Sequence, residues 1–100
     1  MHKKSRKYDL IIAASYIDEN KTYEGKLKIN KENIVFLAKS KTDRLKKVVI
    51  PIKDVVSIIK KTSLGFIPNV LILKTETNSY RFNVYSREQI IKYINEAKEA

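Results

Sequence analysis

Alternating hydrophobic and polar positions dominate residues 8–84 of the chain. The clearest case is the segment 23–29, in which Tyr23, Gly25, Leu27 and Ile29 alternate with charged residues. A period of two residues is typical of a β-strand with one face in solvent. The segment therefore predicts such a strand, and the same extended pattern recurs on both sides of it.

Turn residues divide the rest of this region into further strands. Residues 34–38 are apolar on both faces, as in a central strand, and the polar residues 30–33 join them to the preceding strand as a hairpin. Pro51 has no N–H group, so the strand through residues 48–50 must end there or lie at a sheet edge. We expect further strands at 55–61, 70–75 and 79–84, with Asn78 able to adopt a left-handed conformation in the last turn.

The hydrophobic period changes at Ser86, where a helix is predicted to start. Ser86 and Gln89 have the spacing of a capping box, in which each side chain bonds the other residue's backbone N–H. An apolar stripe follows at Ile90, Ile91, Ile94 and Ala97. We expect the three isoleucines to be buried.

This order of elements predicts the fold class. About seven antiparallel strands followed by one C-terminal α-helix indicate a mainly β protein, an open barrel whose free end the helix closes. One hundred residues are enough for a single core, so we expect one domain over residues 1–100, with residues 1–7 as a basic, flexible tail.

Several strand motifs together resemble those of a known family. Residues 23–29, 34–36, 49–55, 71–75 and 80–82 are similar to successive strands of a GRAM domain in the pleckstrin-homology-like (PH-like) superfamily. The resemblance implies a PH-like split barrel and a non-catalytic module that binds lipid headgroups or proteins. The abundance of Lys, Ile and Asn favours a bacterial source with an AT-rich genome.

The net charge of +10 points to an anionic partner. Residues 1–61 hold 16 basic and 7 acidic residues, whereas residues 62–100 are nearly balanced. The chain lacks cysteine and has one histidine, His2; it has no P-loop and no G-x-S-x-G motif. We therefore expect no catalytic residues, no metal site, no cofactor and no small-molecule substrate.

Basic residues are densest between the strands at 34–38 and 48–50. Such a run is either a solvated loop or a surface that binds an anionic partner. The candidate anion-binding or partner-binding residues are Lys39, Lys41, Arg44, Lys46, Lys47, Lys60 and Lys61. Lys46 and Lys47 are expected to point to opposite faces if the strand has already begun there.

An apolar loop supplies a second candidate contact, formed by Leu64, Phe66 and Ile67. These side chains either pack against the barrel or stay exposed as a contact for a membrane or a protein partner.

Six tyrosines interleaved with lysines suggest an alternative, a nucleic-acid-binding small β-barrel on which bases stack over a basic groove. Tyr23 and Tyr80, however, are in phase with inward positions, which favours packing in the core or at the barrel rim. We therefore expect the partner to be an anionic membrane surface or a protein, and leave the oligomeric state open. No apolar stretch approaches a spanning helix, so we expect a cytoplasmic protein, peripheral at the inner face of the membrane when it binds lipid.

Overall fold

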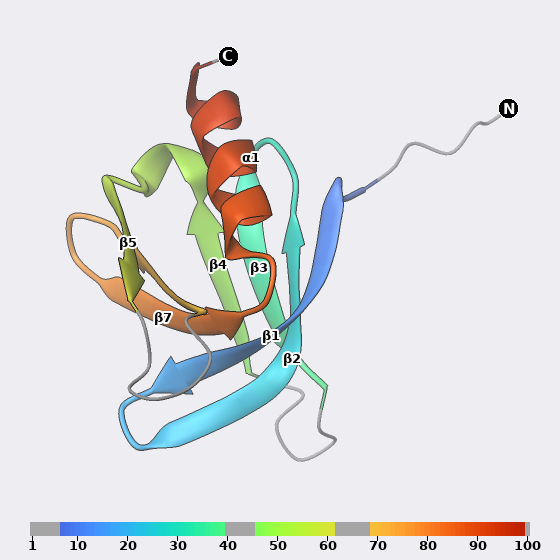
Figure 1. Ribbon diagram of the computed structural model, residues 1–100, viewed down its shortest axis with the longest axis vertical. Coiled ribbons are helices and arrows are strands. Elements are labelled where there is room, and N and C mark those ends of the chain that lie inside the picture. The colour runs from blue at the N-terminus through green and yellow to red at the C-terminus, as the bar shows by residue number, and fades with distance from the viewer. Residues whose placement is uncertain (1–6, 40–45, 62–68, 100) are drawn as a thin grey trace, which may run out of the picture.

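The computed structural model describes residues 7–39, 46–61 and 69–99. Within them the chain forms seven strands, one short 3-10 helix and one α-helix, which confirms the predicted mainly β fold closed by a C-terminal helix (Figure 1). The elements are β1 (Leu10–Asp18), β2 (Lys21–Ile29), β3 (Asn33–Ala38), β4 (Lys47–Pro51), η1 (Ile52–Asp54), β5 (Ser57–Lys61), β6 (Val70–Lys74), β7 (Ser79–Val84) and α1 (Arg87–Glu99).

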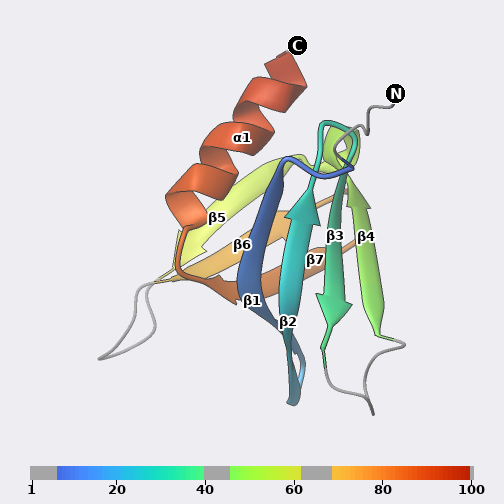
Figure 2. The same cartoon turned by 90° about the vertical axis from the view of Figure 1, so that its right-hand side faces the viewer.

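All strands belong to one antiparallel sheet in the order β4-β3-β2-β1-β7-β6-β5. β1 pairs with β2 along its whole length and with β7 only from Ala14 to Ile17, so the sheet bends where β1 changes neighbours. Figure 2 shows β1–β4 side by side in front of β5–β7. The sheet is thus a half-barrel, with β4 and β5 as its two edge strands.

The core lies between the two halves of this curled sheet. Its largest fully buried side chains include Phe36 of β3, Phe82 of β7 and Leu27 of β2. Tyr23 and Tyr80 are partly buried and pack against the same cluster, in agreement with their inward phase in the sequence. Hydrophobic burial across all seven strands is the main term that holds the barrel together.

Helix α1 packs on the barrel through part of its apolar stripe (Figure 1). Ile90 and Ile94 are fully buried, as predicted. The expectation for Ile91 was wrong: it is only partly buried, because one helical step of about 100° turns it from the core toward a cleft beside β5. Ser86 directly precedes the helix and its carbonyl accepts a bond from the Ile90 N–H; the side-chain bonds of the capping box stay a prediction.

Three local features refine the predicted strands. The strand expected over 55–61 begins only at Ser57, because the 3-10 helix turns the chain first and buries Val55 in the core. β4 ends at Pro51 and is an edge strand, as the missing N–H requires. Asn78 does not use a left-handed conformation; its N–H donates to the Thr75 hydroxyl, which orders the β6–β7 turn.

Candidate functional site

Charged residues meet at the tip of the β1–β2 hairpin. β1 and β2 pair up to Asp18 and Lys21, so a two-residue turn, Glu19-Asn20, joins them. Glu19 adopts a φ of 53°, the left-handed conformation that such tight hairpin turns require. The tip lies at the end of the molecule away from the C-terminus of α1 (Figures 1 and 2). Lys46, just before β4, reaches this tip and places its Nζ 3.4 Å from Asp18 Oδ2.

Two tyrosine rings lie beneath these charges. Tyr16 and Tyr23 face each other across the hairpin, with their ring centroids 6.3 Å apart in a stacked arrangement. The Lys46 Nζ lies 5.7 Å from the Tyr16 ring and 5.2 Å from the Tyr23 ring, and the Lys21 Nζ lies 4.9 Å from the Tyr23 ring. We call Tyr16, Asp18, Lys21, Tyr23 and Lys46 the rim cluster.

The Tyr16 ring links the rim cluster to the core. Its centroid is 5.6 Å from that of Phe36 and 5.3 Å from that of Phe82, and only 8% of the residue is exposed. Burial raises the pKa of the Tyr16 hydroxyl, and the neighbouring charge of Asp18 adds to the effect. Tyr16 therefore offers a neutral, rigid ring to the cations above it.

Lys46 keeps hydrogen-bonding capacity for a ligand. An ammonium group has three N–H donors, and the bond to Asp18 uses one of them. The Lys46 side chain is 32% exposed and that of Asp18 43%, so this ion pair adds only about 0–1 kcal/mol to stability. The rings add about 0.5–1 kcal/mol each at such exposure. The cation is thus positioned without being enclosed.

The structure brings three of the predicted basic residues to this end of the barrel. Lys39 follows β3 and donates its backbone N–H to Glu24 O, and Lys46 and Lys47 precede and begin β4. Lys46 contacts the rings on the inner side, whereas Lys47 pairs with Leu37 and is exposed on the outer side, so the two do point to opposite faces.

Lys60 and Lys61 lie elsewhere, on edge strand β5. The Lys60 Nζ is 3.0 Å from Glu88 Oε2 of α1, and the Lys61 carbonyl accepts a bond from Arg87. Both residues thus contact α1 and are not part of the rim cluster. Of the other predicted site residues, Lys41, Arg44, Leu64, Phe66 and Ile67 lie outside the described residues.

Sequence reasoning did not single out Tyr16, Asp18 and Lys21 as site residues. Their juxtaposition depends on the hairpin register, which sets Tyr16 opposite Tyr23. In a hairpin closed by the two-residue turn 19–20, residues at equal distances from the turn pair with each other. Tyr16 and Tyr23 are at equal distances from this turn, so their spacing in the sequence could have predicted their contact.

A cleft of about 370 Å³ lies between β5 and α1, lined by Val56, Ile58, Lys60, Ile91 and Lys98 among others. It contains no carboxylate, histidine or cysteine. Throughout residues 7–39, 46–61 and 69–99, no group of three or more His, Cys, Asp or Glu side chains is arranged to hold a metal ion. None of the helices in these segments is long and apolar enough to cross a membrane.

Comparison with solved structures identifies the same fold. The C-terminal domain of an unknown protein from Leishmania infantum superposes with a TM-score of 0.79 at 15% identity, covering 93% of this chain and 84% of that one. The N-terminal PH domain of human ARAP2 gives a TM-score of 0.70 at 14% identity, covering 90% and 78% of the two chains. No curated protein matches the sequence.

The GRAM domain family matches residues 5–99, which is nearly the whole chain. The split barrel, the closing helix and the strand motifs agree with this match. The protein belongs to the GRAM domain family and has the PH-like fold.

Proposed function

We propose that this protein is a non-catalytic binding module that docks on an anionic lipid surface through its rim cluster. The observation that carries the proposal is the position of Lys46, whose ammonium group lies over two tyrosine rings with donors left for a phosphate or carboxylate.

The charge near the rim cluster sets the expected strength. Lys21, Lys39, Lys46 and Lys47 oppose Asp18 and Glu19 there, and each basic residue near an acidic leaflet contributes about 1 kcal/mol. A net charge of about two then gives about 2 kcal/mol, which is weaker than a millimolar affinity. The proposal therefore includes further contacts from Lys41 and Arg44, which lie in the sequence between Lys39 and Lys46, and from the apolar residues Leu64, Phe66 and Ile67, which follow Lys61.

The same proposal assigns no reaction to the protein. PH-like and GRAM domains act as binding modules, and the described residues hold no cluster of His, Cys, Asp or Glu that could bind a metal. It further places the protein in the cytoplasm, peripheral at the inner leaflet.

Co-sedimentation with vesicles tests the proposal. Wild-type protein is expected to bind phosphatidylserine-containing vesicles weakly, and phosphatidylcholine vesicles not at all, with the binding lost at high salt. Lys46→Glu changes the charge by two at the rim cluster, so it should weaken binding by about 30-fold. Lys60→Glu is the matched control, because it makes the same change of charge on β5.

Two outcomes would overturn the proposal. Equal loss in both variants would show that overall charge, and not the rim cluster, binds the vesicles. Tighter binding to a single-stranded oligonucleotide than to vesicles, with a steep salt slope, would favour the nucleic-acid alternative. The buried state of Tyr16 and the partial burial of Tyr23 and Tyr80 argue against base stacking on these rings.

A further inference from the structure

The outer face of strands β1–β4 carries hydrophobic residues where an antiparallel sheet normally shows polar ones. Ile11 is 57% exposed and Val49 47% exposed, and both stand on the side of the sheet away from the core. Val35 of β3 faces the same side, is buried, and lies outside the main core cluster. A strand whose two faces are both apolar is typical of a sheet covered on both sides.

The strand register gathers these residues into two adjacent rows. In one row Ile11 is opposite Lys28, Lys28 opposite Val35, and Val35 opposite Val49. The other row, two residues along each strand, consists of Ala13, Lys26, Leu37 and Lys47. Residues paired across an antiparallel sheet point to the same face, so the eight side chains form one surface. We call it the outer patch.

The outer patch is basic as well as apolar. It contains three lysines and no carboxylate, and Lys28 also lies 5.8 Å from the ring of Tyr8 at its border. At its borders, Glu24 accepts a bond from the Ser15 hydroxyl, and Asp9 accepts one from Tyr93 of α1. In the parts of the chain that the structure describes, no ribbon crosses this face (Figure 2).

We propose that the outer patch docks an acidic amphipathic helix of a protein partner. Three inter-strand spacings of about 4.8 Å make the patch about 14 Å long, and its two rows are about 7 Å apart. Three turns of a helix measure about 16 Å, and an apolar helix stripe matches the width of two rows. Carboxylates beside that stripe would pair with Lys26, Lys28 and Lys47.

The position of Ile11 selects a helix over an added strand. A strand paired with the free edge of β4 would cover Val49 and leave Ile11 exposed, because β1 lies three strands away from that edge. Only an element lying across the face contacts both residues. A second copy of the chain does not match in charge, because each copy carries +10.

The outer patch is also separate from the rim cluster. Ile11 lies seven residues before Asp18 on β1, which is about 23 Å along the strand. A molecule docked on a surface by the hairpin tip therefore leaves most of this face free for a partner. Apart from Lys47, which lies near both surfaces, the two share no residue, so the inference does not rest on the proposed lipid binding.

A designed peptide tests the outer patch directly. The probe is a side-chain-stapled helix with leucines on one face flanked by glutamates, and its control carries lysines in place of the glutamates. When the stapled peptide is titrated into the full ¹⁵N-labelled chain, the amide NMR signals of the outer patch should shift and those of the β5–α1 cleft should stay unchanged. Val49→Asp and Lys28→Glu should each weaken binding by about tenfold or more. Val56→Asp should not, although Val56 is another valine with 60% exposure.

Each alternative result would contradict the inference. It is overturned if the glutamate and lysine peptides bind equally, if shifts occur only at the rim cluster, or if Val56→Asp weakens binding as much as Val49→Asp. It is equally overturned if Val49→Asp abolishes vesicle binding, or if it converts a stable dimer to a monomer. If circular dichroism shows that one of these variants does not fold, Lys26→Glu takes its place, because Lys26 is exposed. This variant should weaken peptide binding by the same factor.

Discussion

At the residue scale, Gly25 is required by the close approach of β2 to β3. A Cβ atom added there would lie 2.0 Å from Leu37 O and 2.8 Å from Ala38 Cα, which are backbone atoms that cannot turn aside. We predict that Gly25→Ala destabilises the fold by about 1–3 kcal/mol, the usual range for overpacking. Denaturant unfolding measures this, with Lys26→Ala at the exposed neighbour as the control. A loss below about 0.5 kcal/mol, typical of surface changes, would disprove the close packing.

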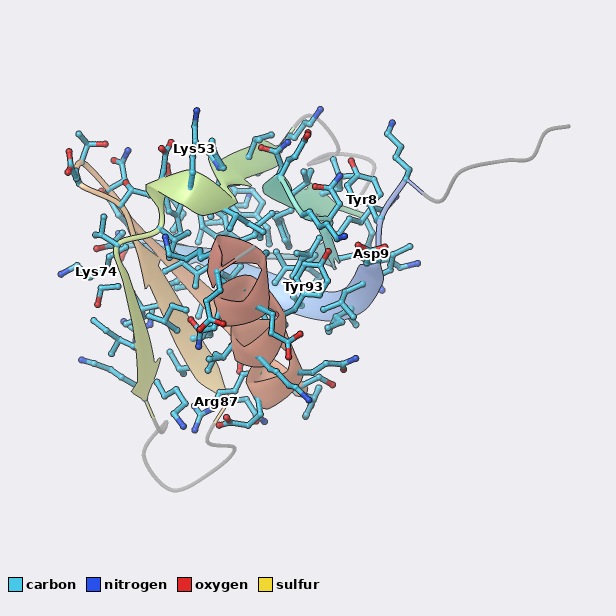
Figure 3. All side chains as sticks on the ribbon, turned by 90° about the horizontal axis from the view of Figure 1, so that it is seen from above. Tyr8, Asp9, Lys53, Lys74, Arg87 and Tyr93 are labelled. Carbon is cyan, nitrogen blue, oxygen red and sulfur yellow. The ribbon has the colours of Figure 1, made fainter. Side chains whose placement is uncertain are left out.

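Tyr93 and Asp9 tie the C-terminal helix to the start of β1 (Figure 3). The Tyr93 hydroxyl donates to Asp9 Oδ2 at 2.5 Å. Burial and this hydrogen bond raise the pKa of Tyr93 to about 12. The folded protein thus retains a proton that the unfolded chain loses near its ordinary pKa of about 10, so the contribution of this group to stability falls as the pH rises from about 10 to about 12.

We predict that Tyr93→Phe lowers the free energy of unfolding by about 1 kcal/mol at neutral pH. The difference between wild type and variant should shrink as the pH rises from about 10 to about 12, because only the wild type loses this proton. Urea unfolding at several pH values measures both proteins, and their comparison cancels the titration of the lysines. A difference that stays constant up to the folded-state pKa would refute the coupling between Tyr93 and Asp9.

At the element scale, α1 is held by two buried isoleucines and by polar bonds at both ends. Arg87 donates to the carbonyls of Lys61 and Val70, and Lys98 donates to that of Val55. We predict that Ile94→Ala costs about 2–4 kcal/mol in denaturant unfolding, since it empties a fully buried site. Ile91→Ala is the matched control and should cost clearly less, because Ile91 borders the cleft. Equal losses would mean that both residues contribute to the core alike.

Most of the secondary structure follows from the hydrophobic period, and the exceptions have local causes. The hydrophobic patterns and the turn residues between them placed β2, β3, β6 and β7 to within one or two residues at each end. They extended the strand before Lys61 too far toward the N-terminus, because Val55 is buried without joining a ladder. Ile91 likewise belongs to the apolar stripe of the helix and was therefore expected to be buried. The barrel covers only part of that stripe and leaves Ile91 partly exposed.

The candidate site was only partly predictable for a related reason. The run of basic residues made Lys39, Lys46 and Lys47 candidates from charge alone. The aromatic rings that position Lys46 come from another hairpin, 23 to 30 positions earlier in the chain, and only the tertiary fold brings them together. Charge patterns thus located the cations, whereas the sheet topology supplied their surroundings.

At the scale of the whole molecule, the two proposed surfaces lie on different sides of one barrel. The rim cluster occupies the hairpin end of β1 and β2, and the outer patch occupies the broad face of β1–β4 (Figure 2). Together the two proposals describe a module that holds a protein partner beside an anionic surface. Lys47, at the start of β4, belongs to the outer patch and directly follows Lys46 of the rim cluster.

The central claim is that the rim cluster contacts the anionic surface, and paramagnetic relaxation on vesicles tests it most directly. Vesicles containing phosphatidylserine and a headgroup spin label should broaden the amide signals of Asp18, Lys21, Lys39 and Lys46, and leave those of α1 sharp. The effect should disappear at high salt, because the contact is electrostatic. Broadening centred on Lys60, Lys61 and α1, or no broadening at low salt, would contradict the account.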